Sequence, residues 1–100
     1  MSTEPKWAYD LEITLIRGEG CCAAGHTIGD KWLWSGDSEQ LDLGSGMCVH
    51  ALSSMLPKLT AMRYGAKLPW LKEDANTSDH LCPDVANPHV FRIHRITRSQ

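Results

Sequence analysis

The most chemically suggestive part of the sequence is a short, glycine-rich segment that contains Cys22, His26 and Asp30. Glycines at positions 25 and 29 permit tight turns, so the first two side chains can point at one centre without a helix. A thiolate and an imidazole are preferred ligands of Zn²⁺ and Fe²⁺. A structural zinc site takes four ligands, so this segment predicts only half of such a site.

Two further cysteines stand where they could complete a metal site. Cys48 shortly follows a Gly-Ser-Gly run and opens a helical pattern, and the start of a helix favours a thiolate because its amides and dipole stabilise negative charge. Cys82 precedes a Pro-Asp turn. We therefore predict a transition-metal site, with zinc first and iron second. Its ligands are Cys22, His26, Cys48 and Cys82.

The same atoms allow nucleophilic catalysis. Cys22, His26 and Asp30 have the residue types of a nucleophile, a base and an orienting carboxylate. This alternative hypothesis is a small lyase, isomerase or hydrolase acting on a small organic substrate, in a pocket lined by Trp34, Trp70 and His80. Three relay members within nine residues are hard to place around one substrate. Asp30 is therefore expected to cap a turn or to hydrogen-bond the His26 ring.

Thiol redox chemistry is the third hypothesis. Cys21 and Cys22 would then exchange disulfides with Cys48 or Cys82, as in a redox or sensor protein. A bridge between adjacent residues is strained, so Cys21 is at most a resolving thiol. Free cysteines also occur as small buried apolar residues, which is the structural alternative for Cys48 and Cys82.

Hydrophobic periodicity predicts the elements that must position these residues. Positions 9–16 alternate like a half-buried strand, and the aromatic run 31–34 predicts a second strand. From position 47 apolar residues recur at helical spacing. Pro57 interrupts this pattern and predicts a kink or two short helices, and Gly65 suits a left-handed helix end.

The remaining segments complete an α+β prediction. Residues 72–79 are expected to be an exposed loop, and residues 89–97 a strand with His89 and His94 as surface or strand-face residues. The tryptophans are expected mainly in the core. This order predicts an α+β fold, a small antiparallel or mixed sheet with a kinked helix or helix pair packed on one face.

Composition describes a single small globular domain. The chain has 100 residues, of which 42% are apolar and 22% charged, with a net charge of -2. We expect an N-terminal extension at 1–8, one domain at 9–97 and a tail at 98–100. No signal-peptide pattern and no spanning apolar run are present, so a cytoplasmic protein with reduced cysteines is expected.

The charge balance bears on the partners. Ten basic and twelve acidic side chains do not create the positive electrostatic field that attracts a phosphate backbone. We therefore expect no nucleic acid and no membrane as partner. A small molecule or a protein remains open as a partner, and so does the choice between a monomer and a homo-oligomer.

Several motifs occur in an order that resembles a known family. They are the Gly-His and Gly-Asp pairs after Cys22, the cysteine at 48, the Gly-Ala-Lys-Leu-Pro-Trp segment at 65–70 and the Cys-Pro-Asp turn at 82–84. In these features the chain resembles a family of short, uncharacterised microbial proteins with cysteine-containing repeats, over residues 9–97. The resemblance implies that Cys22, His26, Cys48 and Cys82 belong to one metal or active site, and it implies no particular reaction.

Overall fold

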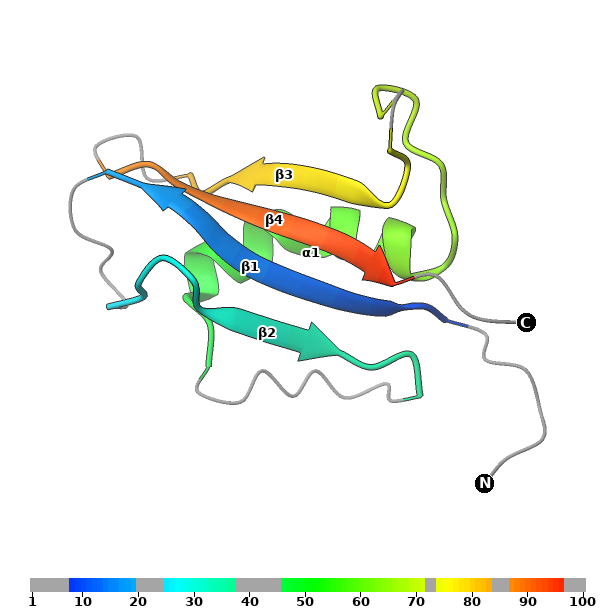
Figure 1. Ribbon diagram of the computed structural model, residues 1–100, viewed down its shortest axis with the longest axis horizontal. Coiled ribbons are helices and arrows are strands. Elements are labelled where there is room, and N and C mark those ends of the chain that lie inside the picture. Colours follow the sequence, from blue (N-terminus) through cyan, green and yellow to red (C-terminus); the bar gives the residue numbers. More distant parts are fainter. Residues whose placement is uncertain (1–7, 20–24, 38–45, 72–73, 84–86, 97–100) are drawn as a thin grey trace.

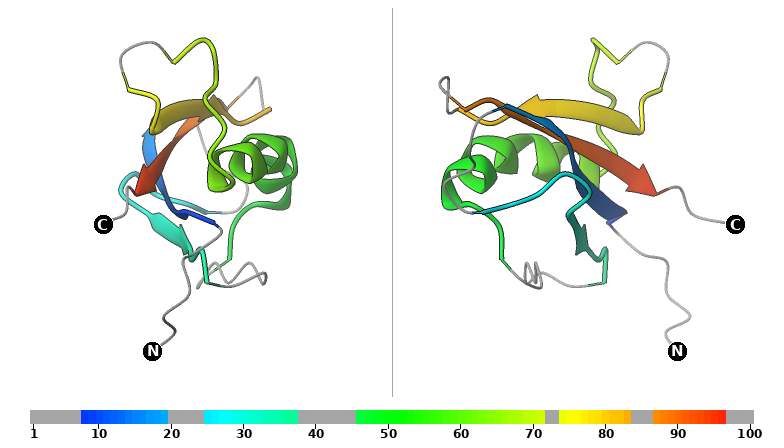
Figure 2. Two further views of the ribbon diagram at one scale, coloured as in Figure 1. Left: turned by 90° about the vertical axis from the view of Figure 1, so that its right-hand side faces the viewer. Right: turned by 60° about the vertical axis from the view of Figure 1, so that its left-hand side comes forward.

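The computed structural model describes residues 8–19, 25–37, 46–71, 74–83 and 87–96. These residues form one four-stranded antiparallel sheet with the order β2-β1-β4-β3, and one helix covers one of its faces (Figure 1; Figure 2). The predicted α+β class is therefore confirmed. The elements are β1 (Asp10–Gly18), β2 (Lys31–Trp34), α1 (Val49–Arg63), β3 (Thr77–Leu81) and β4 (His89–Ile96).

The inner face of the sheet, which α1 covers, is apolar because large apolar residues occupy alternate positions of the strands. In the central strands the side chains of Leu11, Ile13, Phe91 and Ile93 are buried on this face. The helix contributes an apolar stripe at three- and four-residue spacing. The buried core consists of Leu11, Ile13, Leu15, Trp32, Trp34, Ala51, Met55, Leu59, Met62, Phe91 and Ile93.

The helix runs through Pro57 as one element, so the expectation of a helix pair is wrong. Proline removes the amide that would bond to the carbonyl of Ser53. Ser53 and Pro57 both lie on the exposed side of α1, where water can donate a hydrogen bond to this carbonyl instead. The helix ends at Arg63, and Gly65 just beyond it has the predicted left-handed conformation, with a φ of +90°.

A buried arginine on β4 fixes the end of α1 to the sheet. The guanidinium of Arg95 donates to the carbonyls of Met62 and Ala66 at 3.0 and 2.8 Å, and to the carbonyl of Ala75 at 3.0 Å. Its Nε donates to Asn76 Oδ1 at 3.0 Å. A cation here also complements the negative end of the helix dipole. Arg95 therefore links β4 to the end of α1 and to residues 75–76.

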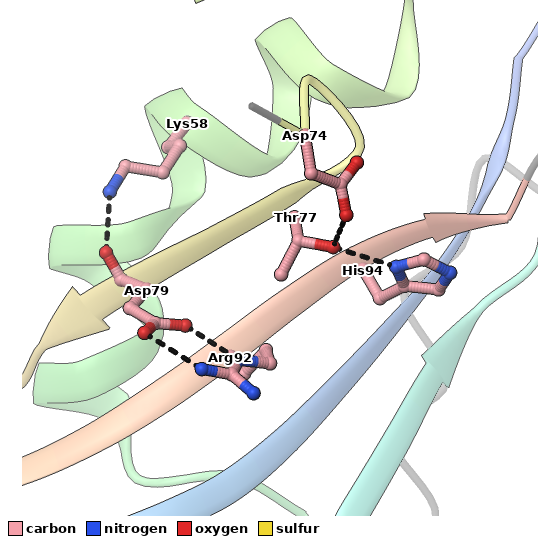
Figure 3. A network of polar contacts seen from close by, with 6 residues as sticks. All are labelled: Lys58, Asp74, Thr77, Asp79, Arg92 and His94. Carbon is pink, nitrogen blue, oxygen red and sulfur yellow. Dashed lines mark hydrogen bonds and ion pairs between the residues drawn. The ribbon is translucent and has the colours of Figure 1, made fainter. Parts of the chain in front are cut away.

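The strand β3 corrects the expectation of an exposed loop over residues 72–79. Its residues are mostly polar, and it is held as an edge strand by side chains from its neighbours (Figure 3). Asp79 accepts from Arg92 Nε and Nη2 at 2.9 and 3.2 Å, and Lys58 Nζ donates to the Asp79 carbonyl at 3.2 Å. Cross-strand and helix contacts, not apolar periodicity, therefore define this strand.

Candidate functional site

Three of the four predicted ligands, His26, Cys48 and Cys82, fall within the described residues, and they lie at the same end of the domain. We call it the Cys48 end: the place where β1 and β3 finish and where α1 and β4 begin (Figure 1). The amide of Cys82 extends the pairing of β3 by donating to the His89 carbonyl at 2.8 Å. The turn at 27–30 joins this end through the Gly29 amide, which donates to the Leu15 carbonyl at 2.8 Å.

The imidazole of His26 holds the start of the helix. Its Nε2 accepts the amide hydrogen of Cys48 at 3.0 Å, and its side chain is only 11% exposed. The ring stands edge-on to Trp32, at 4.9 Å between centroids, and Trp32 Nε1 in turn donates to the Gly46 carbonyl at 2.8 Å. An amide is a donor only, so Nε2 provides the lone pair and the ring proton lies on Nδ1. In this arrangement neither ring nitrogen of His26 has a lone pair left for a metal ion.

Asp30 closes the turn, as the sequence predicts. Its carboxylate accepts the amide of Thr27 at 2.9 Å and the hydroxyl of Thr27 at 3.1 Å. The distance to His26 Nδ1 is 4.0 Å, which is longer than a hydrogen bond. A base must offer a lone pair to the thiol, and the Nε2 lone pair of His26 is already held by an amide. The arrangement therefore gives no support to a Cys-His-Asp relay.

The two described cysteines are partly buried thiols outside any disulfide. Cys48 and Cys82 both pack against the apolar core. Cys48 is the N-cap residue of α1, and its side chain makes no capping hydrogen bond. Among residues that the structure describes, no three His, Cys, Asp or Glu side chains are grouped so that they could hold a metal ion. Cys21 and Cys22 lie outside those residues, so the four-ligand set stays a prediction.

The structure does not bring the predicted pocket residues together. Trp34 is on the edge strand β2, where it is 8% exposed and packs under the Arg63 guanidinium at 4.3 Å from its ring centroid. His80 is on β3, the opposite edge of the sheet. Trp70, expected in the core, is 61% exposed and follows the helix.

His80 joins β3 to the helix instead of lining a pocket. Its Nε2 lies 3.0 Å from Ser54 Oγ, and this hydroxyl donates to the Ala51 carbonyl at 2.9 Å. His80 Nε2 is therefore the donor toward the hydroxyl. Burial lowers the pKa of His80 below its usual value, and the nearby Lys58 ammonium lowers it further.

His89 is a buried strand-face residue, so of the two positions expected for it the surface position is wrong. It is 7% exposed and lies on the inner face of the sheet, opposite Gly18 of β1. Its Nδ1 is 2.8 Å from the Asn87 carbonyl oxygen. The strand period contains the missed signal, since the alternation that turns Phe91 and Ile93 inward places His89 on the same face.

Among the described residues, no helix combines the length and apolar character needed to cross a membrane. The chain matches no protein-family model, no curated protein and no solved structure. The resemblance to the cysteine-containing repeat family therefore stays a prediction, and the chemistry of the Cys48 end rests on its own residues.

Proposed function

We propose that this small α+β domain binds a transition-metal ion, zinc first, at the Cys48 end, in a structural or accessory role. The proposed ligands include the thiolates of Cys22, Cys48 and Cys82. The observation that supports the proposal most directly is the hydrogen bond from the Cys48 amide to His26 Nε2, at 3.0 Å. It fixes a cysteine at the first turn of a helix, at the end of the domain where the second described cysteine also lies.

The start of α1 is suited to a negatively charged ligand. The helix has 15 residues, and its first turn contains no acidic side chain. The amides of that turn have no intrahelical acceptors, and together with the helix dipole they stabilise a nearby anion. A metal-bound thiolate at Cys48 would provide that charge.

The proposed zinc ligands at the Cys48 end are cysteine thiolates. Cys48 and Cys82 supply two thiols, and the lone pair of His26 Nε2 is committed to an amide. His26 is thus a positioning residue in this proposal, and Cys22 is the third thiolate. A small domain has little stability to spare, and a bound metal would add to it.

The test is metal analysis of protein purified without chelators, combined with titration of reactive thiols. We expect about one zinc ion per chain with protected thiols, and loss of the ion in the variants Cys22→Ser, Cys48→Ser and Cys82→Ser. Cys21→Ser is the matched control and should keep the metal. His26→Gln should also keep it, because the glutamine carbonyl can accept the same amide.

Other outcomes would redirect or end the proposal. Metal-free wild-type protein with freely reacting thiols refutes it. A disulfide from Cys22 to Cys48 or Cys82, found by peptide mapping under non-reducing conditions, would instead support the thiol-redox hypothesis. Loss of zinc in His26→Gln, with the fold intact, would return His26 to the ligand set.

A further inference from the structure

We propose that the face of the sheet opposite α1 binds a second copy of this chain, so that two domains form a symmetric dimer, sheet against sheet. We call this surface the outer face. The inference does not depend on the proposed metal-binding function, and its test is made on metal-free protein.

The outer face is covered by no helix or strand among the residues that the structure describes (Figure 2). It is formed by the side chains that alternate with those of the buried core along each strand. Three large apolar side chains on it are exposed, Leu33 at 52%, Leu81 at 59% and Ile96 at 37%. They belong to three different strands, so association through this face removes apolar area from water along much of the sheet.

The charges of the outer face balance. Its acidic and basic side chains are those of Asp10, Glu12 and Asp79, and those of Arg17, Lys31 and Arg92. The net charge of the face is therefore zero, counting histidine as neutral. Two copies of a face of one sign would repel each other, and two copies of this face do not.

Strand pairing arranges these charges so that the two edges of the sheet differ in sign. Thr14 of β1 is paired with Lys31 on β2 and with Arg92 on β4, and Arg92 is paired with Asp79 on β3 (Figure 3). These four residues form one row across the sheet, the Thr14 row, with a cation at the β2 edge and an anion at the β3 edge. Such a row is complementary to its own copy when the copy is turned by 180° about the strand direction.

A twofold axis along the strands, between β1 and β4, provides this complementarity without any shift of register. It places β1 over β4 of the second copy and β2 over β3, so each row meets the same row. Lys31 then faces Asp79 of the second copy, and each such contact is made twice. An axis across the strands would place each strand over its own counterpart, so that Arg92 meets Arg92 or His94 of the second copy. The charges therefore favour the axis along the strands.

The charges of the Thr14 row have partners within the chain, and these pairs are exposed. Lys31 Nζ lies 3.8 Å from Glu12 Oε1, and Arg92 Nε lies 2.9 Å from Asp79 Oδ1; all four side chains are at least 40% exposed. Exposed ion pairs of this kind add little to the stability of a single domain. In the dimer, Lys31 approaches Asp79 of the second copy while both keep their internal partners. The pairs then join into one network, and no charge is buried without a counter-charge.

The size of the outer face predicts a weak dimer. Four strands about 4.8 Å apart and eight residues about 3.3 Å apart span roughly 19 Å by 26 Å, so two faces together bury about 1,000 Å². This area is at the lower limit for a specific interface. We therefore expect a dissociation constant between about 1 µM and 1 mM.

The test uses two charge reversals in the complete chain, Lys31→Glu and Asp79→Lys. Either variant alone should repel itself, because like charges then face each other at both contacts of the dimer. In a mixture of the two variants, the two altered residues face each other at one contact, and the two unaltered residues do so at the other. Opposite charges are thus restored at both. Lys67→Glu is the matched control, since it makes the same reversal at an exposed position that follows α1.

Sedimentation equilibrium in the presence of a chelator and a reductant measures dimers without metal or disulfide contributions, and circular dichroism monitors the fold. We expect each variant alone to dimerise about 10-fold or more weakly than wild type, and the equimolar mixture to form heterodimers with about the affinity of wild type. Lys67→Glu should match wild type. Because the mixture contains the same two proteins, its recovery cannot come from a change of fold.

Other outcomes overturn the inference. Wild-type protein that stays monomeric up to about 1 mM leaves the outer face to solvent or to a different partner. A dimer that neither variant weakens, or a mixture that associates no better than its components, shows that the copies meet through another surface. The proposed metal-binding function would stand in each of these cases. Conversely, wild-type protein that dimerises as expected but takes up no metal refutes the proposed function alone.

Discussion

Substitution of Gly18 by alanine tests the packing on which the position of His89 depends. The new Cβ would lie 2.6 Å from His89 Nε2, far inside van der Waals contact, so the ring must move. Overpacking of this kind costs about 1–3 kcal/mol, and loss of the hydrogen bond from Nδ1 to Asn87 adds about 1 kcal/mol. We expect Gly18→Ala to lower the free energy of unfolding by about 2–4 kcal/mol.

The same substitution should have the opposite sign when the ring is absent. In a His89→Ala background the space above Gly18 is empty, and alanine in a strand is favoured over glycine by about 0.5 kcal/mol. The coupling free energy between the two positions is then about 2.5–4.5 kcal/mol.

Urea denaturation of the four proteins of the cycle, in the presence of a chelator, measures this coupling without any metal contribution. Gly36→Ala is the control, because a Cβ there meets the backbone of Ala8, and its effect should add to that of His89→Ala. Additive effects of Gly18→Ala and His89→Ala, within about 0.5 kcal/mol, would show that the ring does not occupy this space.

Three further outcomes are expected. Arg95→Met should lower the free energy of unfolding by about 3–5 kcal/mol in chemical denaturation, because it removes a buried cation and leaves several carbonyls without a donor. The pKa of His80 is lowered by burial and then by Lys58, so the folded state binds its proton less readily than the unfolded chain does. Stability should therefore fall as the pH drops below the ordinary histidine value of 6.5, and His80→Gln should flatten this part of the curve of urea midpoint against pH. The hydrogen bond from Thr77 lowers the pKa of Asp74. The ionised Asp74 carboxylate therefore stabilises the fold at pH values above its ordinary pKa of 3.8, and this stabilisation is lost in more acid solution. Thr77→Val should raise the pKa of Asp74 in an NMR titration.

The elements with strong apolar periodicity could be predicted from the sequence. Strand β1 and the aromatic strand β2 have a clear alternation, and the stripe of α1 follows helical spacing. The strand β3 could not be found in this way because its edge position leaves most of its side chains polar. Its stability comes from pairing with β4 and from contacts such as the one between Arg92 and Asp79, which join residues 13 positions apart.

Residue type and spacing did not predict the part that His26 plays at the Cys48 end. His26 has the type and the spacing of a ligand, but its partner is a backbone amide 22 positions along the chain. Such a contact depends on how the helix start meets the turn, which no local spacing encodes. The buried position of His89, in contrast, follows from the strand period once the inward positions of Phe91 and Ile93 are recognised.

The energy needed to free its ring nitrogen makes His26 a positioning residue of the proposed metal site and not a ligand. To bind a metal through Nε2, His26 must release the partly buried amide of Cys48, and an unsatisfied buried donor costs about 1–3 kcal/mol. This cost corresponds to a factor of about 5–150 in metal affinity. We therefore expect the amide of the residue that opens α1 to keep its acceptor when a metal ion binds.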